Sequence, residues 1–177
     1  MLRELGAVIV DADEATHAVY AAGTPGFDAI VDAFGKDYVR GGEIDRTRLG
    51  ELVFRDPEAR RRLNAIVHPL VREWMADRTV EAAEGGAEVI VQDVPLLFEN
   101  SLQGLFSATV LVYVAQGLQI QRLEARGVPR ERALGMIAAQ MPIEEKRSLA
   151  DFVIDNSGSL ERTRHEVEDV WSKVRAL

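Results

Sequence analysis

The sequence predicts an α/β protein in which a parallel sheet carries helices on both faces. Four short apolar runs rich in β-branched residues are expected to be strands, at residues 8–10, 87–91, 109–114 and 152–154. Continuous apolar runs of this kind are typical of strands buried on both faces. Segments with helical periodicity separate the runs, and this alternation favours parallel strands. With 177 residues and a hydrophobic content of 47%, the chain can form one well-buried domain with a helical insertion.

The composition excludes several classes of protein. The formal net charge of −8 argues against a nucleic-acid partner, because affinity for nucleic acid depends on a basic surface. The chain has no cysteine, which excludes disulfides and thiolate metal sites. It has no apolar run long enough to span a membrane, and its first residues do not resemble a signal peptide. We therefore expect a soluble cytoplasmic protein without a membrane partner, either a monomer or a weak homo-oligomer.

The first strand ends in two carboxylates, Asp11 and Asp13. Ligands of open α/β sheets bind beyond the carboxyl ends of the strands, and a turn here would let both side chains reach that crevice. An acidic pair in this place suits metal or proton chemistry. The alternative is that one of the two aspartates caps the helix that begins near Glu14, and the two residues alone favour capping.

Residues 14–86 are expected to be almost entirely helical. Helical periodicity and capping residues predict helices over 14–22, 27–34, 47–54, 57–67 and 69–84, and a loop over 38–42. Asp45 and Asp56 are the expected N-caps of two of these helices. A helix break is predicted at His68-Pro69, where His68 would cap the helix that Pro69 begins.

The C-terminal half continues the alternation of strands and helices. After the strand at 109–114, helices are expected over 118–125 and 130–140, and a final amphipathic helix over 160–174 follows the last strand.

Seven segments of the chain resemble the dephospho-CoA kinase family in order and spacing. They read V-I-V-D-A-D, G-T-P-G-F, L-V-F-R-D-P-E-A-R-R-R-L, I-V-H-P-L-V, V-P-L-L-F-E-N, A-A-Q-M-P and A-D-F-V-I-D-N-S-G. The motifs V-P-L-L-F-E and I-x-H-P-L-V are distinctive, and the set spans nearly the whole chain. The resemblance implies a P-loop kinase that uses ATP and Mg²⁺. Such an enzyme phosphorylates the ribose 3′-hydroxyl of dephospho-CoA, the last step of coenzyme A synthesis.

The resemblance also implies a division of the chain into domains. Residues 1–13, 87–117 and 148–177 would form an incomplete nucleotide-binding core. Residues 14–86 would bind dephospho-CoA, and residues 118–147 would form a small lid.

The phosphate-binding motif of P-loop kinases, G-x-x-x-x-G-K-[ST], does not occur in the sequence; the only Gly-Lys pair, Gly35-Lys36, precedes Asp37. Residues 1–6 are expected to be the last turn of the helix that follows this loop in the family. A strand, the loop and most of a helix, roughly twenty residues, would then precede Met1 or have been lost. Two explanations stay open: Met1 is an internal methionine taken as the start, or the chain is a natural remnant.

The missing strand would lie at the centre of the family's sheet. It would separate the strands predicted at 87–91 and 109–114. We therefore expect the facing edges of these two strands to lack a partner, which is costly for buried backbone groups.

The resemblance assigns the chemistry to three carboxylates. Asp13 corresponds to the general base that deprotonates the attacking hydroxyl, with helix capping as the alternative. Asp11 would support the magnesium ion or the substrate. Asp93, expected just after a strand, would be a second carboxylate that orders the metal.

The residues expected to contact dephospho-CoA are His68, Pro95, Leu96 and Arg62. His68 is expected either to touch the substrate or only to cap a helix. Arg62 belongs to the run 60–62, which is either a solvated helix face or a contact for a substrate phosphate.

The residues expected to contact ATP lie in and after the lid. Arg122 and Arg126, four residues apart on one expected helix face, would close over the phosphates. Lys146 and Arg147 are weaker candidates for the same role. Asn156 would lie near the adenine, with a plain turn residue as the alternative.

Three functions remain open at this point. The first is a dephospho-CoA kinase, and the second is a remnant that binds dephospho-CoA or CoA without kinase activity. The third is another P-loop kinase of nucleosides or nucleotides, against which His68-Pro69 and residues 94–99 argue.

Overall fold

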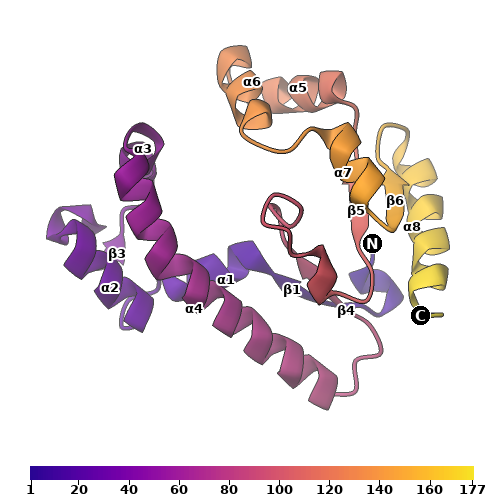
Figure 1. The fold of residues 1–177 in the computed structure, drawn as a ribbon, viewed down its shortest axis with the longest axis horizontal. Coiled ribbons are helices and arrows are strands. Elements are labelled where there is room, and N and C mark those ends of the chain that lie inside the picture. The colour runs from indigo at the N-terminus through magenta and orange to yellow at the C-terminus, as the bar shows by residue number, and fades with distance from the viewer. The chain divides into compact units, whose positions relative to one another are not determined.

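The computed structural model describes residues 1–177 and divides them into two compact units (Figure 1). One unit is Val8–Asp93. The other combines Met1–Ala7 with Val94–Leu177. Both units join parallel strands to helices, as the predicted α/β class requires.

The Val8–Asp93 unit contains a pair of parallel strands, β1 (Val8–Asp11) and β4 (Ile90–Asp93). Strand β4 begins three residues later than the prediction, so Asp93 ends the strand instead of following it. The reason lies in the end of the preceding helix, where the Ala87 N–H donates to the Ala82 carbonyl at 3.0 Å. This bond commits residues 85–87 to a helix cap, and they cannot join the strand.

Four helices make up most of this unit. They are α1 (Ala12–Val19), α2 (Pro25–Phe34), α3 (Arg46–Arg55) and α4 (Pro57–Glu84). Their apolar faces meet in one core, in which Ile30 and Leu49 are almost completely buried. Asp45 and Asp56 cap α3 and α4 as predicted, because each side chain accepts backbone N–H bonds from the first helical turn.

The predicted helix break at His68-Pro69 is wrong, because α4 runs unbroken from Pro57 to Glu84. Proline removes one backbone hydrogen bond from a helix interior. Here Leu63 and Val67 before the proline and Leu70 after it pack against the same core. Continuing the helix buries both flanks at once, which offsets the lost bond. His68 therefore caps nothing and lies exposed within the helix.

The segment predicted as a loop over 38–42 contains a small hairpin. After a 3₁₀ turn (η2, Lys36–Tyr38), strands β2 (Val39–Arg40) and β3 (Glu43–Ile44) pair antiparallel. Gly41 and Gly42 form the turn at φ angles of 62° and 87°. Two central residues with positive φ are the requirement of a tight hairpin turn, so the Gly-Gly pair was the signal.

The second unit contains the other parallel pair, β5 (Val110–Tyr113) and β6 (Phe152–Asp155). Its helices are α5 (Gln116–Ala125), α6 (Arg130–Ala138), α7 (Ile143–Leu149) and α8 (Leu160–Val174), with a 3₁₀ turn η3 (Gln103–Leu105). The core packs Ile154 of β6 against Val167 and Val170 of α8. Helix α8 has the predicted bounds, whereas the sequence did not predict α7.

The first residues of the chain pack on this same core. Leu2 and Leu5 contact the buried cluster around Ile154, and Arg3–Leu5 form a single 3₁₀ turn, η1. Gly6 ends the turn at a φ of 108°, as expected of a helix-terminating glycine.

Strands β4 and β5 belong to separate two-stranded sheets. Strand β4 pairs only with β1 and β5 only with β6, so each has one edge without a strand partner. The position of a further strand between them stays a prediction. None of the helices combines the length and the apolar character that a membrane span needs.

Candidate active site

Three carboxylates gather at the carboxyl ends of β1 and β4. Asp11 and Asp93 are direct partners in the parallel ladder, and Asp13 lies in the first turn of α1. Asp11 is the N-cap of α1, and its Oδ1 accepts the Asp13 N–H at 2.7 Å. The carboxylate of Asp13 is exposed and has no hydrogen bond or ion pair. Of the two aspartates at this turn, Asp11 therefore does the capping and Asp13 is free for chemistry.

Burial and the charges of this cluster shift the pKa of Asp93. Partial burial, followed by the negative charges of Asp11 and Asp13, raises the pKa of Asp93 above its ordinary value. The three groups therefore resist being ionised together, and a nearby cation would relieve that repulsion.

The chain does not form a complete metal cage at this or any other place. No group of three or more His, Cys, Asp or Glu side chains is arranged to hold an ion by itself. Mg²⁺ in phosphoryl-transfer enzymes is commonly held by one or two carboxylates together with substrate phosphates. The acidic cluster fits that kind of site, because its carboxylates repel one another.

A cluster that the sequence analysis missed lies along α1. The guanidinium of Arg46 contacts Nε2 of His17 at 2.5 Å and lies over the ring of Tyr20, 5.2 Å from its centroid. His17 is four residues after Asp13, so the two share a helix face. The four-residue spacing of Asp13 and His17 is visible in the sequence. Arg46 belongs to α3, and only the fold brings it to this face of α1.

The motif G-T-P-G-F has a structural explanation. The Thr24 hydroxyl donates to the Val19 carbonyl at 2.7 Å and accepts the Phe27 N–H at 3.1 Å, which ends α1 and begins α2. Gly26 is buried, and a Cβ atom there would collide with the Val19 carbonyl oxygen and the Val19 side chain. This motif therefore packs α1 against α2.

Two residues expected on the substrate side have defined surroundings in α4. His68 is exposed, with no hydrogen-bond partner in the chain. Arg62 donates to the Ala33 carbonyl at 3.3 Å and lies over the Phe34 ring at 5.9 Å. Arg62 thus secures the end of α2. Pro95 and Leu96 belong to the other unit, where both are exposed.

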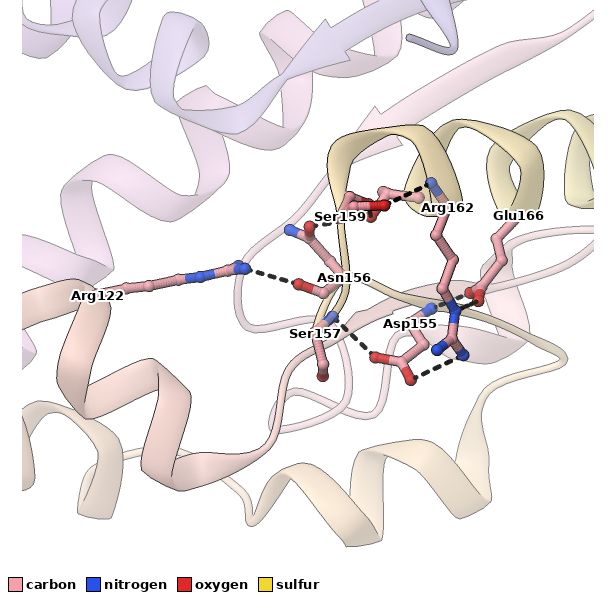
Figure 2. Close-up of polar contacts among 8 residues, drawn as sticks. Arg122, Asp155, Asn156, Ser157, Ser159, Arg162 and Glu166 are labelled. Atoms are coloured by element: carbon pink, nitrogen blue, oxygen red, sulfur yellow. Dashed lines mark hydrogen bonds and ion pairs between the residues drawn. The ribbon is translucent and has the colours of Figure 1, made fainter.

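Two of the residues expected on the nucleotide side, Arg122 and Asn156, meet at the end of β6, as Figure 2 shows. Arg122 of α5 donates to the Asn156 carbonyl at 2.7 Å, and the Asn156 N–H donates to the Tyr113 carbonyl at 2.8 Å. The Asn156 Oδ1 accepts from the Thr163 hydroxyl at 3.3 Å, whereas its Nδ2 has no partner. Asn156 therefore joins β5, α5 and α8, and this is more than a plain turn residue does.

Below Asn156, Asp155 anchors the turn that leads into α8 (Figure 2). It accepts the Ser157 N–H at 2.9 Å and lies 3.7 Å from the Arg162 guanidinium. The hydrogen bonds from Ser157 lower the pKa of Asp155, so its carboxylate stays ionised at neutral pH.

The remaining basic candidates differ in their surroundings. Arg126 follows the end of α5, with an exposed side chain that has no partner in the chain. Its backbone N–H donates to the Arg122 carbonyl at 3.3 Å, which continues the helical turn as far as Arg126. Arg147 of α7 is exposed and lies 4.9 Å from the centre of the Tyr113 ring. Lys146 is buried in an ion pair with Glu99, so its cation is not available to a ligand.

Comparisons with known proteins agree on one family. The family model for dephospho-CoA kinase matches residues 1–162. The chain is 42% identical to the dephospho-CoA kinase of Frankia casuarinae over 97% of this chain and 74% of that protein. It is 43% identical to that of Geobacillus kaustophilus, over 100% and 89% of the two chains.

Two solved structures share the fold of this chain. TT1252 from Thermus thermophilus superposes with a TM-score of 0.82 at 34% identity, covering 98% of this chain and 87% of that one. The dephospho-CoA kinase from Campylobacter jejuni superposes with a TM-score of 0.72 at 25% identity, covering 98% and 88%.

Proposed function

The chain belongs to the dephospho-CoA kinase family, and from this premise we propose how its residues take part in the phosphorylation of dephospho-CoA. In the proposed reaction, Asp13 accepts the proton of the ribose 3′-hydroxyl while that oxygen attacks the γ-phosphorus of ATP and ADP leaves. One observation carries this assignment. The Asp13 carboxylate has no partner in the chain, because Asp11 serves as the helix cap. A general base needs such a free carboxylate.

We assign Asp11 and Asp93 to Mg²⁺, the ion that this class of reaction uses to neutralise charge on the transferred phosphate. The support is their adjacency in the ladder and the repulsion that raises the pKa of Asp93. Oδ1 of Asp11 is used in the helix cap, which leaves Oδ2 for an ion.

The helical region 14–86 is proposed to bind dephospho-CoA. Arg46 is the strongest cationic candidate, because His17 and Tyr20 hold its guanidinium on the Asp13 face of α1. His68, Pro95 and Leu96 are exposed and free to touch the substrate, whereas Arg62 is engaged with α2.

Residues 118–147 are proposed to act as a lid over ATP. Arg126 and Arg147 are exposed cations, and Arg122 is already tied to the Asn156 carbonyl. The Nδ2 group of Asn156 has no partner in the chain and can donate a hydrogen bond to an acceptor atom of the adenine ring. We also propose that the enzyme works in the cytoplasm as a monomer or weak homo-oligomer.

The polypeptide of 177 residues lacks a phosphate cradle of the G-x-x-x-x-G-K-[ST] type. We propose that the 177 residues alone bind dephospho-CoA but transfer phosphate poorly, because phosphoryl transfer depends on positioning and charge stabilisation.

The test is ADP release from ATP, measured with the 177-residue chain and with a version that carries a strand, P-loop and helix ahead of Met1. Dephospho-CoA should support turnover only in the extended version. CoA is the matched control, because its 3′-hydroxyl is already phosphorylated and should give no turnover. Turnover with nucleosides but not with dephospho-CoA would overturn the proposed substrate.

A further inference from the structure

The most deeply buried ion pair of the chain joins Glu99 to Lys146. The Lys146 Nζ lies 2.6 Å from Glu99 Oε1, and the two side chains are only 8% and 18% exposed. The same Glu99 oxygen accepts the Met141 N–H at 3.0 Å. Each of the other ion pairs includes at least one side chain that is half exposed or more, and such pairs contribute little.

Specific bonds compensate the burial of one Glu99 oxygen, Oε1, whereas Oε2 is buried without a hydrogen-bond partner. Burial alone would raise the pKa of Glu99, but the bond from Lys146 and two backbone N–H bonds hold it below its ordinary value. Removing one partner of such a pair leaves an uncompensated charge in a poorly hydrated place. The pair therefore locks the position of Lys146, and with it the rotation of the seven-residue helix α7.

The opposite side of α7 touches the end of β5. The Tyr113 hydroxyl donates to Glu144 Oε1 at 2.6 Å, and the Arg147 guanidinium lies 4.9 Å from the Tyr113 ring centre. Glu144 and Arg147 are three residues apart and share a helix face, whereas Lys146 points about 100° away from Arg147. The rotation of α7 that buries Lys146 therefore also brings Arg147 to Tyr113.

We propose that Glu99 is a positioning residue: through Lys146 it orients α7, and α7 places Arg147 at the carboxyl end of β5. Ligands of α/β sheets bind at that edge. The further step, that Arg147 meets the phosphates of ATP, rests on the proposed function. The position of Arg147 at the end of β5 does not depend on that function, and the experiment measures this position without phosphoryl transfer.

The readout is Tyr113 in the 177-residue chain. The Glu144 hydrogen bond raises the pKa of Tyr113, while Arg147 lowers it and Asp155 raises it. Its titration can be followed by NMR of ¹³C-labelled tyrosine, assigned with Tyr113→Phe, with circular dichroism confirming the fold at each pH. Hydrogen exchange of the Met141 and α7 amides gives a second readout at neutral pH.

Lys146→Met removes the cation at nearly constant length. It should move the Tyr113 titration down toward the ordinary tyrosine value and speed exchange of the α7 amides by about tenfold or more. Lys146→Arg keeps the charge and should restore both signals. Arg147→Ala should shift the Tyr113 pKa the opposite way, upward, because it removes the cation over the ring, together with the 3.9 Å ion pair between Arg147 and Glu144. Glu99→Gln keeps the shape of the side chain and should shift the Tyr113 titration in the same direction as Lys146→Met. It replaces Lys146→Met in the test if that variant does not fold.

Val167→Ala is the control for general loss of stability, since it truncates the core of the same unit without touching a polar contact of α7. It should leave Tyr113 unchanged. The proposal is overturned if Lys146→Met and Glu99→Gln leave the Tyr113 titration unchanged, or if Val167→Ala shifts it as much.

Discussion

Asp11 Oδ1 accepts a hydrogen bond from the backbone N–H of Asp13 at 2.7 Å. This contact gives the two aspartates of D-A-D different roles, although the sequence presents them as a pair. Asp11 ends β1 and caps α1, while the Asp13 side chain stays free. Mutations at the two positions should therefore have different effects on stability and on catalysis.

Replacing Asp11 by alanine removes the cap of α1. We expect Asp11→Ala to lower the free energy of unfolding by about 1 kcal/mol, the usual value for a lost N-cap. Asp11→Ser keeps an acceptor and should retain most of the stability, and Asp13→Ala is the control that removes a carboxylate without removing a cap. Urea unfolding of the three variants measures these free energies. Equal losses of stability in Asp11→Ala and Asp13→Ala would contradict the assignment of Asp11 as the cap.

The acidic cluster should make stability depend on pH through Asp93. Its pKa is raised in the folded state, by partial burial first and then by Asp11 and Asp13. The folded state thus binds this proton more tightly, and the associated stability is complete below the ordinary value of 3.8 and is lost as the pH rises through the raised pKa. Asp93→Asn should therefore stabilise the chain at pH 7, by less than about 1 kcal/mol because Asp93 is only partly buried and solvent screens its charge.

The comparison with wild type must be made at two pH values. Below pH 3.8 the advantage of Asp93→Asn should disappear, because Asp93 is then protonated in both the folded and the unfolded chain. Thermal unfolding measured at both pH values tests this, and a stabilisation that is the same at acidic and neutral pH would argue against charge repulsion as its cause.

Gly26 should tolerate no side chain. A Cβ at this position meets backbone and side-chain atoms of Val19, so Gly26→Ala should destabilise the chain by about 1–3 kcal/mol, the usual cost of overpacking. Gly50→Ala is a matched control within α3, because a Cβ there meets nothing within 4 Å. That variant should be stabilised by up to about 1 kcal/mol through helix propensity. Chemical denaturation that ranks the two variants in the reverse order would refute the packing account.

The elements that the sequence predicted well are those specified by local signals. Helix α8 matched at both ends because Ser159 caps it and its apolar residues repeat with helical spacing. The caps Asp45 and Asp56 were equally readable. Each signal lies within a few residues of the structure that it specifies.

The misses depend on contacts between distant segments. The core that α4 shares with α2 carries the helix through Pro69, against the local preference of proline. Helix α7 has no capping side chain and is held by the buried pair with Glu99, which no local pattern predicts. Arg46 reaches His17 only because α3 and α1 pack around the same core.

The central claim is that Asp13 is the general base for phosphorylation of dephospho-CoA. Its most direct test is the steady-state kinetics of Asp13→Asn in the version of the chain that carries a P-loop ahead of Met1. The amide keeps the shape of the side chain but cannot accept the proton, so kcat should fall by about 10²–10⁴-fold while KM for dephospho-CoA changes little. An unchanged kcat, or a loss confined to KM, would contradict the claim and would make Asp13 a binding contact only.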